Sequence, residues 1–228
     1  MTDKDIRNQE RSFKRLLELV LGDEELWELL NFVAKYNQVF IFSGVIRDFF
    51  TGMFSGVRDI DVVLQNTNHL DLLLSNLKNV EVRKNNLGGI KLKYKHLSFD
   101  IWGMGETWNI KRNNLKANPY ILINTVFFNF SAIVFDFQKE KFIYRKEFLD
   151  FLNTQEMNII CPDNPNEPLC IINTLYYRQK YGFAISSDLS KWVKKRYNPA
   201  MNFFEVQQSH FGLVLYSDME IEKFIKSI

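Results

Sequence analysis

The sequence predicts an α+β fold, in which a mixed sheet flanked by helices is followed by a small helical domain. The N-terminal segment carries apolar residues at helical spacing, whereas short apolar runs bounded by turn-forming residues dominate from residue 39 to residue 103. A segment at 161–168 then holds three of the five prolines, and two helical patterns follow it. These observations indicate a sheet-containing front portion and a helical back portion.

Composition and charge restrict the class of protein. The 228 residues are 46% hydrophobic and 25% charged, which is typical of a globular chain. No apolar run is long enough to predict a membrane-spanning helix, and the charged N-terminus does not resemble a secretory signal. Cys161 and Cys170 are too few for a disulfide framework or a zinc site, so we expect a cytoplasmic protein. The net charge of +2 means that anion binding must come from local patches.

The predicted elements follow one another from the N-terminus. Helices are expected on both sides of Gly22, because apolar residues recur at helical spacing there: Phe13, Leu16, Leu17, Val20, Leu21, Leu26, Leu29, Leu30 and Val33. A buried strand at 39–44 ends in Ser-Gly and leads into a helix at 45–52 that Gly52 closes. The next expected elements are a strand at 58–64, a helix at 68–77, and strands at 80–84, 89–95 and 97–103.

The second half of the chain begins with a short helix expected at 120–125. Two apolar segments, 126–130 and 132–137, flank Ser131. The proline-rich segment 161–168 is the best candidate for a domain boundary, and helices are expected at 169–181 and 188–197.

One stretch of the sequence, 41–64, carries the residues that predict chemistry. Ser43 and Gly44 stand at a strand-to-helix turn, where backbone N–H groups and the helix dipole favour a phosphate. Asp59 and Asp61 follow on a strand, and side chains two residues apart point to the same face. Paired carboxylates repel one another unless a cation lies between them, and Mg²⁺ prefers oxygen ligands. A phosphate-binding turn beside such a pair predicts nucleotidyl or phosphoryl transfer.

These residues resemble the head-domain signature of the poly(A) polymerase and bacterial-type tRNA nucleotidyltransferase (CCA-adding) family, in the DNA polymerase beta-type superfamily. That signature reads Gly-Gly-x-Val-Arg-Asp, a short apolar helix and Asp-x-Asp. The similarity covers roughly residues 38–197, and Ser43 takes the place of the first glycine. The matching residues are Ser43, Gly44, Ile46, Arg47, Asp48, Asp59 and Asp61.

The resemblance implies a domain organisation and a site. Beside the N-terminal helices that the apolar spacing predicts over 1–37, it implies a polymerase beta-type nucleotidyltransferase head as catalytic domain over 38–150 and a neck-like helical domain over 160–228. Asp100 resembles the family's third acidic residue, so Asp59, Asp61 and Asp100 are the expected catalytic and metal-binding set, with Mg²⁺ as the ion and Mn²⁺ as an alternative. The expected nucleotide-binding residues are Ser43, Gly44, Arg47, Asp48 and Arg58.

Some roles have an ordinary structural alternative. Arg47 and Asp48 could contact the triphosphate, or they could form an ion pair that locks the helix below the site. The basic segment 191–197 could bind RNA through Lys191, Lys194, Lys195 and Arg196, with aromatic residues stacking on bases, or it could be a solvated helix face.

The chain also departs from the family where the family recognises the base. The family's Arg-Arg-Asp run corresponds to Asn118, Pro119 and Tyr120. Its base-pairing Glu-Asp-x-x-Arg motif corresponds to Asn166, Glu167 and Cys170, and further helix arginines become Asn173 and Tyr176. These departures predict weaker selection of C and A.

The sequence is therefore compatible with three functions. The first is a template-independent, two-metal nucleotidyltransferase that adds NMP from an NTP to an RNA 3′ end, with tRNA as one acceptor. The second is a compact nucleotidyltransferase toxin or defence protein that modifies RNA or a partner protein. The third is a non-catalytic nucleotide-binding relic. No membrane partner is expected for any of them.

Overall fold

A computed structural model describes residues 1–22, 24–53, 59–67, 81–84, 89–94 and 97–228. The helix predicted at 68–77 and the candidate residue Arg58 lie outside these ranges. Among the described residues, no helix combines the length and the apolar character that a membrane span requires.

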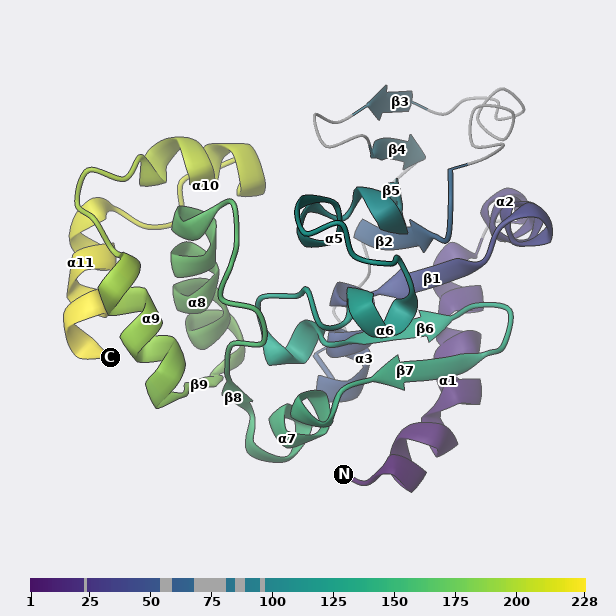
Figure 1. Cartoon of the computed structure of the whole chain (residues 1–228), viewed down its shortest axis with the longest axis horizontal. Coiled ribbons are helices and arrows are strands. Elements are labelled where there is room, and N and C mark those ends of the chain that lie inside the picture. Colours follow the sequence, from purple (N-terminus) through teal and green to yellow (C-terminus); the bar gives the residue numbers. More distant parts are fainter. Residues whose placement is uncertain (23, 54–58, 68–80, 85–88, 95–96) are drawn as a thin grey trace.

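A mixed sheet forms the centre of the front portion (Figure 1). Within the described residues it has seven strands in the order β3-β4-β5-β2-β1-β6-β7. The central pair, β2 and β5, is parallel, and the other neighbouring strands are antiparallel. The strands are β1 (Val39–Phe42), β2 (Asp59–Leu64), β3 (Glu81–Lys84), β4 (Ile90–Tyr94), β5 (Leu97–Gly103), β6 (Ile133–Asp136) and β7 (Lys141–Tyr144).

Helices α1 (Asp3–Leu21), α2 (Glu24–Tyr36) and α3 (Gly44–Thr51) contribute to the main hydrophobic core with one face of this sheet. Helix α1 begins at a capping box formed by Thr2 and Asp5, and it ends at Gly22, which adopts a left-handed conformation. Its apolar stripe, which includes Phe13 and Leu17, is fully buried. Alternate residues of β2 and β5 meet this core: Ile60, Val62, Leu64, Leu97, Phe99 and Ile101.

The opposite face of the sheet carries a smaller apolar cluster. Phe40, Val63 and Val134 of the sheet pack there with residues from the segment that follows β5. That segment contains η1 (Met104–Glu106), α5 (Trp108–Arg112) and α6 (Pro119–Leu122). The acidic side chains of β2 and β5 share this second face, because Asp59 and Asp61 alternate with Ile60 and Val62, which face the main core, and Asp100 is in register with Asp61.

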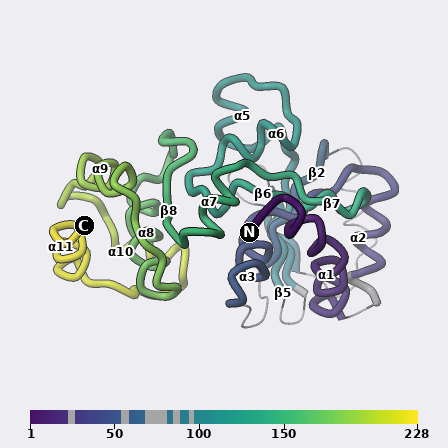
Figure 2. Tube along the Cα trace, turned by 90° about the horizontal axis from the view of Figure 1, so that it is seen from below, coloured from purple at the N-terminus to yellow at the C-terminus, as the bar shows by residue number. Residues whose placement is uncertain are grey.

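The rest of the chain forms a helical portion at one end of the molecule. Figures 1 and 2 both show α8, α9, α10 and α11 gathered away from the sheet. Its core is rich in aromatic residues and also takes in Phe127, Phe128 and Phe130, which precede β6. The elements are η2 (Asn129–Ser131), α7 (Lys146–Thr154), β8 (Glu156–Met157), α8 (Glu167–Tyr181), β9 (Ala184–Ile185), α9 (Ser187–Arg196), α10 (Phe203–Phe211) and α11 (Asp218–Ser227).

The predicted α+β class is confirmed, and so are the strands that carry the motif. The strand expected at 58–64 is β2, and the helix expected at 45–52 is α3, which begins one residue earlier at Gly44. The helix expected at 120–125 is α6, which instead starts at Pro119 and ends at Leu122. Asn118 caps it by accepting a hydrogen bond from the Ile121 N–H.

Candidate active site

The turn between β1 and α3 is built around Ser43. This residue has φ of 46° and ψ of −87°, a backbone conformation that costs energy for any residue other than glycine. Its hydroxyl donates to the Ser131 hydroxyl of η2 at 2.8 Å, so the turn is tied to the segment that precedes β6. A Cβ built on Gly44 would meet nothing within 4 Å, so the space beside this helix N-terminus is open. The phosphate contact expected at this turn stays a prediction.

The carboxylates lie on the two central parallel strands. Asp61 of β2 is directly opposite Asp100 of β5, and Asp59 is opposite Ser98. Asp61 and Asp100 are half-buried, and Asp59 at the start of β2 is exposed. The sheet therefore places the two central acids side by side, with Asp59 two residues further along the same face.

The electrostatics of this pair favour a cation. Burial, together with the neighbouring Asp100 and Asp59 carboxylates, raises the pKa of Asp61 from its usual 3.8 to about 7. Lys91 of β4 lies opposite Asp100 and places its ammonium nitrogen 3.3 Å from Asp100 Oδ2. Among the described side chains, Lys91 is the cation that forms an ion pair with Asp100.

The same residues can be compared with the needs of a metal ion. Within the described part of the chain, no three acidic, histidine or cysteine side chains converge into a ready metal cage. The donor set still fits a hard divalent ion, because three carboxylates share one face and two of them are strand neighbours. Asp59, Asp61 and Asp100 are the residues that would hold Mg²⁺, and Asp100 would exchange Lys91 for the ion.

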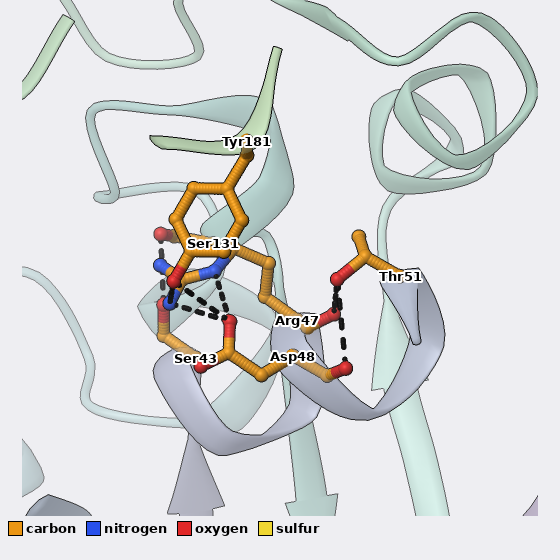
Figure 3. Close-up of polar contacts among 6 residues, drawn as sticks. All are labelled: Ser43, Arg47, Asp48, Thr51, Ser131 and Tyr181. Carbon is orange, nitrogen blue, oxygen red and sulfur yellow. Dashed lines mark hydrogen bonds and ion pairs between the residues drawn. The ribbon is translucent and has the colours of Figure 1, made fainter. Parts of the chain in front are cut away.

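Arg47 and Asp48, both on α3, form an ion pair (Figure 3). The guanidinium Nη2 is 2.7 Å from Asp48 Oδ1, and Nε donates to the same oxygen at 2.8 Å. Only 8% of the Arg47 side chain is exposed. The ion pair that the locking alternative requires is therefore present in the structure, and the roles of the two residues stay predictions.

A cavity of about 340 Å³ separates the sheet from helix α8. Phe42 of β1 lines it and is in register with Asp61, and Ser131 lines it beside Ser43. The α8 wall presents Cys170, Asn173 and Tyr177, and Asp163 is the one charged residue among the described residues that line it. The volume is in the range of small-molecule sites.

Sequence reasoning missed several residues of this region. Phe42, Ser131 and Tyr177 carry no motif of their own, and only the fold brings them beside the turn. The signal for Ser131 was indirect, because it is a polar residue between two apolar segments.

The basic residues of α9 lie away from the carboxylates, in the helical portion (Figure 1). Lys191 pairs with Asp188 at 3.4 Å, and Arg196 pairs with Glu167 at 2.8 Å. Lys194 and Lys195 are exposed. Trp192 is buried against Phe127, with ring centroids 4.7 Å apart, so it is not placed to stack on a base.

The chain is similar to solved structures, although no match to it was found by sequence. No family model matches the chain, and no curated protein matches it. A structure of a CCA-adding enzyme with CTP superposes with a TM-score of 0.66 at 13% identity, covering 92% of this chain and 53% of the other.

Other solved structures are similar to the chain in the same way. A tRNA nucleotidyltransferase complexed with a primer tRNA and an incoming ATP analogue gives a TM-score of 0.62 at 17% identity, over 85% of this chain and 58% of the other. The Thermotoga maritima CCA-adding enzyme complexed with tRNA gives 0.64 at 13% identity, over 90% of this chain and 51% of the other. This chain thus spans little more than half the length of these structures, and at these identities the likeness establishes its fold.

Proposed function

We propose that this chain is a Mg²⁺-dependent nucleotidyltransferase that transfers NMP from an NTP to the 3′ end of an RNA, with tRNA as the first acceptor to test. The observation that carries the proposal is the register of Asp61 with Asp100 on adjacent strands, beside the open turn at Ser43 and Gly44. The fold it shares with CCA-adding enzymes supports the same reaction class.

Each part of the site has a task in this reaction. The backbone at Ser43 and Gly44 holds the triphosphate, and the cavity between the sheet and α8 receives the nucleoside. The acceptor hydroxyl oxygen forms a bond to the α-phosphorus, the bond from the α-phosphorus to the bridging oxygen breaks, and pyrophosphate leaves while the hydroxyl proton passes to solvent. When bound, Mg²⁺ lowers the pKa of the acceptor hydroxyl and offsets the charge of the leaving group.

The RNA partner would be held by exposed cations of the helical portion. Lys194 and Lys195 are free to reach phosphates, whereas Lys191 and Arg196 would first have to leave Asp188 and Glu167. Because Trp192 is buried, the proposed RNA contact is electrostatic in character.

Incubation of the purified chain with each α-³²P-labelled NTP, Mg²⁺ and total RNA tests the proposal. Label in a tRNA-sized product, absent with Asp61→Asn, is the expected result. Label in a protein band would favour the toxin or defence alternative. Nucleotide binding with no transfer to any acceptor would favour the non-catalytic relic.

A further inference from the structure

Arg47 lies inside a box of aromatic side chains that come from a different part of the chain. Its guanidinium carbon is 4.9 Å from the ring centroid of Tyr177, 5.1 Å from that of Tyr181 and 5.5 Å from that of Phe130. Its Nη2 donates to the Tyr181 hydroxyl at 3.3 Å, and that hydroxyl donates to Asp48 Oδ1 at 3.4 Å. Figure 3 shows Tyr181 placed over the Arg47–Asp48 pair.

This box fixes helix α8 against helix α3. A guanidinium that faces several aromatic rings in a buried site gains cation–π attraction, and its planar fork satisfies a carboxylate at the same time. Removing Asp48 would leave the Arg47 charge buried without compensation, which is costly. The contact is therefore specific for arginine in a way that an exposed ion pair is not.

The two helices joined by Arg47 carry different halves of the candidate site. Helix α3 starts at Ser43–Gly44, the proposed triphosphate turn. Helix α8 supplies Asn173 and Tyr177 to the wall of the cavity, where the nucleoside would lie. The Ser43–Ser131 hydrogen bond joins the same turn to the residue that follows Phe130, so the box and the turn are tied together at two points.

We propose that Arg47 is a positioning residue, which holds the α8 wall of the cavity in place relative to the Ser43–Gly44 turn and does not contact the triphosphate. This inference rests on the proposed function. The Nε and Nη2 atoms of Arg47 donate hydrogen bonds to Asp48 and Tyr181, and the arginine side chain is almost entirely buried. The affinity of a ligand that binds only at the turn should therefore not change when Arg47 is replaced. The affinity of a ligand that also occupies the cavity should fall.

Two ligands separate these roles. Inorganic tripolyphosphate offers the phosphates alone, and ATP offers the phosphates with a nucleoside. Calorimetric titration with both, in the presence of Mg²⁺, is carried out on the wild type, Arg47→Lys and Tyr181→Phe. The control is Tyr144→Phe, because Tyr144 also donates its hydroxyl to a carboxylate, that of Asp3, at 2.7 Å, but lies outside the candidate site.

We expect Arg47→Lys and Tyr181→Phe to weaken ATP binding by about five- to fiftyfold, the loss of one or two hydrogen bonds, while tripolyphosphate binding stays within about twofold. Tyr144→Phe should change neither. An equal loss for both ligands in Arg47→Lys would show that Arg47 is a triphosphate ligand. Unchanged ATP binding in both variants would show that Arg47 does not position the α8 wall of the cavity.

Failure of the proposed function has a separate signature, which is a wild-type chain that binds neither ligand. The positioning role is then read from amide hydrogen exchange. Arg47→Lys should speed exchange in α8 by about tenfold or more and leave α9 unchanged, because Tyr177 and Tyr181 of the box belong to α8 and no residue of the box belongs to α9. Unchanged exchange in α8 would overturn the inference independently of any nucleotide.

Discussion

Asp61 and Asp100 are cross-strand neighbours in the only parallel pairing of the main sheet as far as the structure describes it. Because the pair is in register, neither side chain can move away along its strand without breaking the ladder. The repulsion between them is therefore built into the fold, and it is offset on one side by Lys91. A cation bound between the two carboxylates would offset this repulsion and stabilise the folded protein.

Replacement of Asp61 by asparagine should stabilise the metal-free protein. The change removes a carboxylate that is disfavoured by burial and by its two acidic neighbours, and we expect about 1–2 kcal/mol, or roughly 2–8 °C in Tm. Added Mg²⁺ should raise the Tm of the wild type and not that of Asp61→Asn. Thermal unfolding at neutral pH checks both results. A lower Tm for Asp61→Asn without metal would contradict this electrostatic account.

Lys91→Met should tighten binding of Mn²⁺ to the nucleotide-free protein several-fold. The lysine ammonium, 3.3 Å from Asp100, competes with an incoming ion for the same carboxylate. Lys93→Met is the matched control, because Lys93 is exposed on the same strand and lies opposite Ser98 instead of Asp100. Paramagnetic resonance of free Mn²⁺ gives the affinities. Weaker binding in Lys91→Met than in the wild type would mean that the lysine supports the site.

Ser43→Val should destabilise the chain by about 1–3 kcal/mol, because a β-branched residue is strained at the positive φ of this turn. Ser43→Gly should fall within about 1 kcal/mol of the wild type, since relief of strain offsets the lost hydrogen bond to Ser131. Ser131→Ala removes the hydrogen bond alone and serves as the reference. Urea unfolding measures all three, and equal stability of the Val and Gly variants would refute the assigned backbone strain.

Selection between bases should be weaker than in the family that the sequence resembles. The α8 wall of the cavity offers Cys170, Asn173 and Tyr177, none of which carries the fixed donor fork of an arginine. We expect the four ribonucleotides, supplied at equal concentration, to be incorporated with rates that differ by less than about tenfold. Without a directional partner on the base edge, the site loses the penalty for an unmatched hydrogen bond, which is roughly 1–3 kcal/mol or about five- to 150-fold in rate. Ordered addition of C, C and A to a tRNA lacking its end would show this prediction to be wrong.

The sequence predicts the parts of the fold that depend on local pattern. Strand β2 could be predicted because its apolar residues alternate with Asp59 and Asp61, and α3 because Gly44 and Gly52 bracket its apolar residues. The α11 helix was missed although Ser217 and Glu220 form a capping box, a signal that local reasoning could have used. Helix α10 was also missed, although the Asn202 side chain caps its first turn.

The rest depends on contacts between distant parts of the chain. Arg47 and Tyr181 are 134 residues apart in sequence, and nothing near either residue predicts that they meet. The pairing of Asp100 with Asp61 was suggested by family resemblance, but its parallel register, and the approach of Lys91, follow from the strand order alone. The sequence could therefore name the acidic residues and leave undecided whether Arg47 served the fold or the triphosphate.

The most direct test of the account is the rate of label transfer from an α-³²P-labelled NTP to RNA by Asp100→Asn, measured beside Asp150→Asn. Asp150 is an exposed acid of α7, outside the candidate site, and its replacement controls for the loss of one negative charge. We expect Asp100→Asn to fold and to lose at least about a hundredfold in transfer rate, while Asp150→Asn transfers at the wild-type rate. Transfer by a folded Asp100→Asn at more than half of the wild-type rate would contradict the claim that the Asp61–Asp100 pair forms the catalytic centre.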